Sequence, residues 1–129
     1  MLRIIDIQVS GTANGEWVVL QNHGMTTVNL RGFMVCGNTY LRGNPDSAAK
    51  EMFIFTADEP VKPGTRVVLI SSHGSDGWYP TIEGGSAYVT YANRSDSLWS
   101  QADALHLLQP ISTRPIHPGQ ILELVEREA

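Results

Sequence analysis

The sequence predicts an all-β domain in which about seven to nine short strands form a sandwich or a barrel. Short runs of alternating apolar and polar residues recur along the chain, and clusters of Gly, Pro, Asn and Asp separate them. Of the 129 residues, 42% are hydrophobic and 17% are charged, which is a globular balance. A chain of this length is expected to form a single domain, residues 1–129, around one sizeable core.

The first two predicted strands are joined by a turn. Alternation over residues 3–9 places three apolar side chains on one face of a half-buried strand: Ile5, Ile7 and Val9. The turn signal Asn14-Gly15 then predicts a hairpin into a strand that starts at Glu16.

Residues 16–35 form the unit around which the rest of the chain is organised. Val18 and Leu20 share one face of its first strand, because strand side chains alternate. A polar turn at residues 22–24 leads to a second apolar strand, and residues 33–35 begin a third.

The middle of the chain continues this pattern. Phe53 and Phe55 lie on one face of a strand at residues 52–56. Two prolines at residues 58–64 rule out a central strand there. The aliphatic run at residues 66–71 predicts a strand that is covered on both faces or lies centrally in its sheet.

The remaining segments are expected to be loops and closing strands. Residues 36–50 predict a long loop with one helical turn near Asp46. Residues 103–109 predict a strand in which Leu105 and Leu107 point inward. Residues 121–125 are interpreted as a last strand, with a short helix as the alternative.

Several segments carry a pattern shared with a known family. The first has a Glu–aromatic–aliphatic strand that ends in Asn, then a turn, an aliphatic strand and a Gly–aromatic pair: Glu16-Trp17-Val18, Leu20, Asn22, Val28, Leu30 and Gly32-Phe33. The later ones are an aromatic strand, a Pro-Gly turn, an aliphatic strand and a late strand: Phe53-Ile54-Phe55, Pro63-Gly64, residues 67–70 and residues 103–107. This pattern resembles the lamin tail domain, found in nuclear lamins and in many bacterial proteins. The resemblance implies an immunoglobulin-like β-sandwich that binds protein, chromatin or cell-surface partners without catalysis.

Charge and hydropathy restrict the partners. The net charge is −4 and the pI is about 5.4, with only nine Lys and Arg residues, so nucleic acid is not the expected partner. No segment is long and apolar enough to predict a membrane span. No signal peptide follows Met1, so a cytoplasmic location is expected, although a domain excised from a secreted parent would look the same.

The chemistry-bearing residues form no recognisable catalytic or metal-binding pattern. Zinc sites use closely spaced ligand pairs, and the four histidines lie far apart: His23, His73, His106 and His117. Ser72, His73 and Asp76 are sequence neighbours, whereas the members of a catalytic triad converge from separate elements. The lone Cys36 is expected to pack as a small hydrophobe. We therefore predict no enzyme activity, no cofactor and no metal.

An apolar stripe is predicted on the outer face of the organising unit. If Val18 and Leu20 point inward, Trp17 and Val19 point outward. Met34 and Cys36 do so in the third strand if Phe33 and Val35 point inward. In the favoured interpretation the segment 72–100 covers this stripe. In the alternative the stripe is exposed and binds a protein partner, or a second copy in a homodimer.

Residues 72–100 form a Gly-rich connection that holds half of the ten aromatic residues: Trp78, Tyr79, Tyr88, Tyr91 and Trp99. A short strand is expected at residues 88–91, with the remainder irregular and at least three of the rings in the core. Exposed rings beside polar groups such as Asp76 would suit a carbohydrate. The sequence thus predicts a protein-interaction module, with a carbohydrate-binding module as the alternative.

Overall fold

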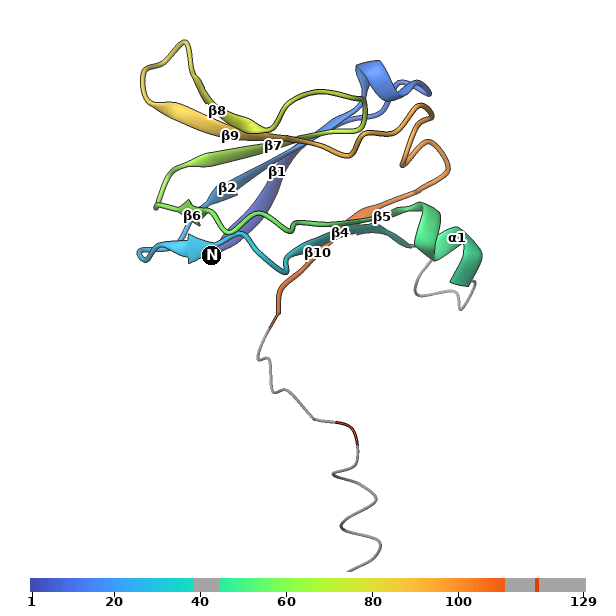
Figure 1. Ribbon diagram of the computed structural model, residues 1–129, viewed down its shortest axis with the longest axis horizontal. Helices are drawn as coiled ribbons and strands as arrows, with labels where there is room; N and C mark the ends of the chain where they lie inside the picture. The colour runs from blue at the N-terminus through green and yellow to red at the C-terminus, as the bar shows by residue number, and fades with distance from the viewer. Residues whose placement is uncertain (39–44, 111–117, 119–129) are drawn as a thin grey trace, which may run out of the picture.

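The computed structural model describes residues 1–38, 45–110 and 118, and its strands form two stacked layers (Figure 1). The first layer is a five-stranded sheet in the order β1-β2-β7-β9-β8. Its strands are β1 (Leu2–Gln8), β2 (Trp17–Asn22), β7 (Arg66–Ile70), β8 (Gly77–Pro80) and β9 (Ser86–Tyr91). The second layer contains the sheets β10-β4-β5 and β3-β6. Its strands are β3 (Val28–Asn29), β4 (Met34–Gly37), β5 (Met52–Ile54), β6 (Pro60–Val61) and β10 (Leu105–Leu108).

The all-β sandwich expected from the sequence is confirmed. The described residues form ten strands, more than the sequence predicts, because the second layer contains two strands of only two residues each. The helical turn expected near Asp46 is α1 (Pro45–Lys50), and a short 3-10 helix (Ala13–Gly15) lies in the β1–β2 connection. Within residues 1–38 and 45–110, no helix has the length and apolar content that a membrane span requires.

The aliphatic strand β7 occupies the centre of the five-stranded sheet, as its sequence predicts. It pairs antiparallel with β2 and parallel with β9. The expected hairpin between β1 and β2 is also present. Because β7 and β9 are parallel, the chain must cross over between them, and β8 forms part of this crossover connection. β8 then pairs antiparallel with the edge of β9 that faces away from β7.

The two sheets of the second layer are connected through their backbones. The Leu30 N–H donates to the Glu59 carbonyl at 2.9 Å, and the Gly32 N–H donates to the Phe55 carbonyl at 2.8 Å. The Phe55 N–H donates to the Phe33 carbonyl at 2.9 Å. Gly32 has a φ of 91°, a conformation that costs glycine little and other residues more. Residues 28–37 and 52–61 therefore run antiparallel as one bent pair.

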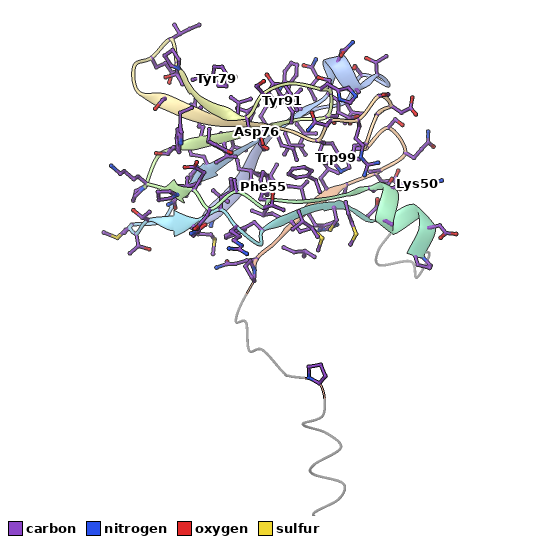
Figure 2. All side chains as sticks on the ribbon, viewed as in Figure 1. Lys50, Phe55, Asp76, Tyr79, Tyr91 and Trp99 are labelled. Carbon is purple, nitrogen blue, oxygen red and sulfur yellow. The ribbon has the colours of Figure 1, made fainter. Side chains whose placement is uncertain are left out.

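The core lies between the two layers (Figure 2). The first layer contributes inward-facing aliphatic residues: Leu2, Val18, Leu20, Val67 and Leu69. The second layer contributes a set that includes two aromatic rings: Leu30, Phe33, Val35, Phe55 and Val61. Phe53 and Phe55 meet edge to face, with centroids 5.1 Å apart and an interplanar angle of 84°. Trp99 is fully buried among them, and its indole Nε1–H donates to the Glu51 carbonyl at 3.2 Å.

The carboxylate of Glu16 is buried at the start of β2 and gathers donors from two distant segments. Its Oε1 accepts from the Ser71 hydroxyl at 2.5 Å, the Leu98 N–H at 2.6 Å and the Trp99 N–H at 3.3 Å. Its Oε2 accepts from the Ser97 hydroxyl. A buried charge needs such partners, because leaving it without them costs several kcal/mol. Glu16 thus fixes the segment that crosses from β9 to β10.

Two expectations about local structure are wrong. Ile5, Ile7 and Val9 do not form the buried face of β1, since each is 40–42% exposed. The register of β1 against β2 shifts between Ile4 and Asp6, and only the start of the strand, at Leu2 and Ile4, packs into the core. In the described part of the chain, residues 5–8 of β1 are exposed.

The connection at residues 72–100 is also more ordered than expected. It contains the complete β8–β9 hairpin, whose turn includes Gly84 and Gly85 with φ values of 89° and 80°. The last strand expected at residues 121–125 lies outside the described residues.

Substitution of Glu16 tests the role of its carboxylate in folding. We expect Glu16→Ala to lower the free energy of unfolding by about 3–5 kcal/mol, because it leaves two buried N–H groups and two serine hydroxyls without their acceptor. Glu16→Gln retains an oxygen for those donors, and its amide can donate to Ser97, so a loss of about 1–2 kcal/mol is expected. Urea denaturation followed by circular dichroism measures both. Equal losses in the two variants would contradict the proposed hydrogen-bonding role.

Candidate functional site

The outer face of the five-stranded sheet carries two rows of apolar side chains across β2, β7 and β9. Residues in register on neighbouring strands share a face, and the alternate residues of β2 and β7 are buried in the core. One row is Trp17, Ile70 and Tyr91, and the other is Val19, Val68 and Val89. All six are partly exposed. We call these six residues the outer sheet face.

Polar residues border the outer sheet face along β1. Asp6 pairs with Val19, and Gln8 pairs with Trp17, so the apolar surface ends at β1. Arg3 lies beside Gln21, one row further along the sheet. The apolar surface therefore has a polar edge, as protein interfaces commonly do.

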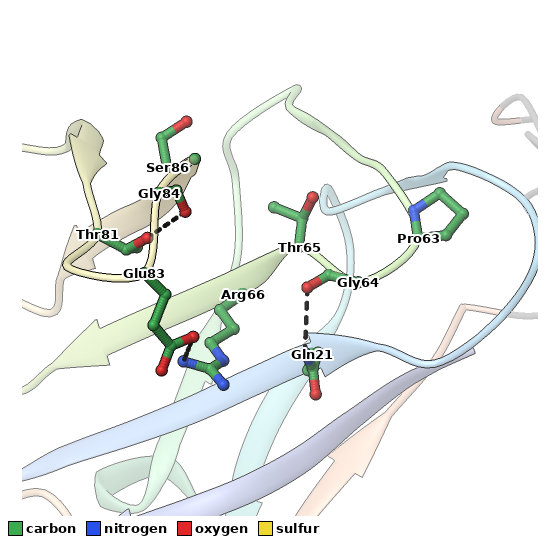
Figure 3. A pocket seen from close by; sticks show the side chains of 10 residues that line it. Gln21, Pro63, Gly64, Thr65, Arg66, Thr81, Glu83, Gly84 and Ser86 are labelled. Atoms are coloured by element: carbon green, nitrogen blue, oxygen red, sulfur yellow. Dashed lines mark hydrogen bonds and ion pairs between the residues drawn. The ribbon is translucent and has the colours of Figure 1, made fainter.

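A small cavity of about 340 Å³ lies beside Gln21, near the end of β2, where the β6–β7 and β8–β9 turns approach each other (Figure 3). Gln21 Nε2 donates to the Gly64 carbonyl at 3.1 Å, and the Thr81 hydroxyl donates to the Gly84 carbonyl at 2.6 Å. The Arg66 guanidinium lies 3.7 Å from the Glu83 carboxylate. Much of the polar lining is thus already paired, and we assign no ligand to this cavity.

The segment at residues 72–76 covers only one end of the outer sheet face. The Tyr91 ring packs directly against the backbone of Gly74. The Asp76 carboxylate fixes this contact, because it accepts from the Tyr91 N–H and the Thr90 hydroxyl, each at 2.9 Å. Trp17, at the other end of the same row, remains partly exposed. The predicted cover is therefore partial.

Met34 does not join Trp17 and Val19 in one stripe, so that part of the sequence prediction is wrong. Met34 lies in β4, in the second layer, and pairs with Ile54 and Leu108. Alternation along a strand gives the face of a side chain but not the sheet to which the strand belongs. The stripe predicted from the sequence is divided between the two outer surfaces of the sandwich.

The five rings of residues 72–100 are placed in three different environments. Tyr88 and Trp99 are in the core, two rings where at least three were expected. Tyr91 and Tyr79 are on the outer side of the five-stranded sheet, and the Tyr79 hydroxyl donates to the Ser75 carbonyl at 2.8 Å. Trp78 is on the inner side but at the sheet edge, where it is 41% exposed. The rings therefore do not form one shared ligand platform.

The described histidines lie apart and contact different neighbours. His23 Nε2 is 2.8 Å from Gln21 Oε1, and His73 Nε2 is 3.4 Å from the Ser95 hydroxyl. His106 pairs with Cys36 across β10 and β4, and His117 lies outside the described residues. In residues 1–38 and 45–110, no three His, Cys, Asp or Glu side chains gather in a metal-binding arrangement.

Three residues of the outer sheet face were not singled out from the sequence: Val68, Ile70 and Val89. For Val68 and Ile70 the signal was the aliphatic run of β7, which predicted cover on both faces or a central position. The central position is what the structure shows.

A comparison of the chain with protein-family models, curated proteins and solved structures finds no match.

The thiol of Cys36 is buried in β4, which fits its expected role as a small strand side chain. The outward position predicted for Cys36 in the apolar stripe is wrong. Burial raises the pKa of this thiol, and the charge of Glu51 acts in the same direction. The neutral thiol is the favoured form in the folded state, and a neutral thiol is a poor nucleophile.

We expect Cys36 in the native protein to resist 5,5′-dithiobis(2-nitrobenzoic acid) at pH 8 and to react quickly in 6 M guanidinium chloride. Absorbance at 412 nm measures the released product. The neutral Cys36 thiol stabilises the folded state, and this stabilisation is complete below the pKa of the thiol in the unfolded chain, about 8.5. It is lost as the pH rises through the higher pKa that the thiol has in the folded protein. Cys36→Ala should lack this part of the pH dependence. Rapid labelling of the native protein would contradict the buried position.

Proposed function

We propose that this chain is a non-catalytic module that binds protein through the outer sheet face. The observation that carries the proposal is the pair of apolar rows across β2, β7 and β9, which are partly exposed and bordered by polar residues on β1. Contiguous apolar surface of this kind commonly marks an interaction site. The net charge of −4 argues against nucleic acid as the ligand.

The partner that we propose is a second copy of the chain. A sheet face can pack on its own copy about a two-fold axis, which requires only a self-complementary patch. Sheets pack face to face at about 10 Å through interlocking apolar side chains. The border includes both Arg3 and Asp6, so neither copy meets an edge of uniform charge.

We also propose that the chain is a bacterial member of the lamin tail domain family. Three residues of the shared pattern have structural roles that support this proposal. Glu16 accepts buried hydrogen bonds, and Asn22 Nδ2 donates to the Val61 carbonyl at 2.9 Å. Gly32 adopts a positive φ immediately before the buried Phe33.

The buried, unpaired Cys36 is compatible with the cytoplasmic location expected from the sequence.

The mass in solution tests the proposed self-association. We expect light scattering to show a dimer that dissociates on dilution. Trp17→Ser should raise the dimer dissociation constant roughly thirtyfold, because truncating a central interface tryptophan commonly costs about 2 kcal/mol. Ile82→Ser removes an exposed apolar side chain at the β8–β9 turn, outside the outer sheet face, and is the matched control. A monomeric mass at every concentration would contradict the proposal.

A further inference from the structure

A second surface lies at the side of the sandwich, between β8 of the first layer and β6 of the second. Trp78 pairs with Tyr88, and Tyr88 pairs with Val67, so all three side chains face the second layer. Because β8 is the edge strand, Tyr88 is buried beneath the second layer while Trp78 remains 41% exposed. The Trp78 ring is therefore presented at the rim of the core.

The position of this ring is fixed by two contacts. The indole Nε1–H donates to Glu59 Oε2 at 3.1 Å. The ring also packs on Tyr88, with centroids 5.4 Å apart and an interplanar angle of 60°. The backbone carbonyl of Glu59 is held in turn by the Leu30 N–H. A ring that is held before binding loses little conformational entropy when a ligand stacks on it.

The phenol of Tyr88 lies behind this ring. Burial raises the pKa of Tyr88, and the nearby carboxylates of Asp76 and Glu59 raise it further. The phenol therefore remains neutral over the physiological range and serves as an uncharged support for Trp78.

A groove of about 380 Å³ opens in front of Trp78. Its volume is within the range of small-molecule sites, roughly 300–1,000 Å³. The residues that line it combine one exposed ring with charged and hydroxyl groups: Glu59, Pro60, Lys62, Thr65, Trp78 and Ser86. Glu59 uses Oε2 for the indole, so its Oε1 can accept from a ligand hydroxyl. Lys62 can donate to a ligand, and Thr65 and Ser86 can both donate and accept.

This arrangement matches the chemistry of a sugar ring. A pyranose has a face of C–H groups that stacks on an aromatic ring, and hydroxyl groups around its edge that need both donors and acceptors. The opposite charges of Glu59 and Lys62 favour a neutral sugar over an acidic or a basic one. We propose that the groove between β8 and β6 binds a neutral pyranose unit of a glycan, with Trp78 as the stacking platform.

A proline-rich peptide is the main competing ligand. Grooves for such peptides are lined by several aromatic side chains. Among the described residues that line the groove, Trp78 is the one aromatic side chain. Its N–H is already used by Glu59 and is not free for a peptide carbonyl. The observations therefore favour the sugar.

Native affinity electrophoresis in gels that contain hydroxyethyl cellulose, xylan, galactomannan or dextran tests this proposal with the full chain. We expect at least one of the four polysaccharides to retard the protein. Trp78→Ala should lower the association constant roughly tenfold or more, as expected for loss of a central aromatic contact. Trp78→Phe keeps a ring against Tyr88 and should retain part of the affinity, which separates loss of binding from loss of folding.

Tyr79→Ala is the matched control. Tyr79 is the next residue on β8, is equally exposed at 43% and faces the opposite side of the sheet, so this variant should bind like the unmodified chain. Trp17→Ser should also leave retardation unchanged, which separates this site from the outer sheet face. The proposal is overturned if no polysaccharide retards the protein, or if Trp78→Ala binds normally. Quenching of tryptophan fluorescence by a proline-rich decapeptide in the unmodified chain but not in Trp78→Ala, with no response to the polysaccharides, would assign the groove to peptide instead.

Discussion

The buried carboxylate of Glu16 is the interaction on which the rest of the sandwich depends. It holds the Leu98 and Trp99 N–H groups against the first layer, and the Trp99 indole reaches the Glu51 carbonyl in the second layer. The same Glu51 carbonyl accepts the Gly37 N–H. A continuous series of hydrogen bonds therefore runs from β2, through the crossing segment, to β4 and β5. The two layers are joined by polar contacts at one end as well as by the apolar core between them.

Asn22 has the matching role at the other end of β2. Its Nδ2 donates to the Thr26 and Val61 carbonyls, and its Oδ1 accepts the Gly24 N–H, each at 2.9 Å. The strand is thus fixed to the second layer near both ends. Trp17 and Val19 project from the strand between these two anchors, so the outer sheet face is presented on a rigid support. Binding to such a support loses less entropy than binding to a flexible loop.

The sequence was most informative where one local preference decides the structure. The central position of β7 follows from its aliphatic run, and the inward leucines of β10 follow from alternation. Features that depend on distant partners were not predictable. The later half of β1 is exposed in the described structure, and the alternation of residues 3–9 does not distinguish a covered strand from an exposed one. The acceptor role of Glu16 was similarly hidden, since its donors lie 55 to 83 residues further along the chain.

The candidate surfaces illustrate the same limit. The sequence pattern placed Trp17 in the apolar stripe and Tyr91 in the aromatic-rich connection, yet both side chains lie in one row with Ile70. The same pattern placed Trp78 and Tyr79 together in the candidate carbohydrate-binding connection. In the structure they face opposite sides of the sheet, because they are adjacent residues of one strand. Register across strands, and not distance along the chain, decides which side chains share a surface. Since β8 pairs with β9 alone, the Trp78–Glu59 and Tyr79–Ser75 hydrogen bonds hold it from its two faces. β8 thus presents Trp78 to the groove and Tyr79 to the opposite side of the sheet, so Tyr79 can be changed without altering the groove.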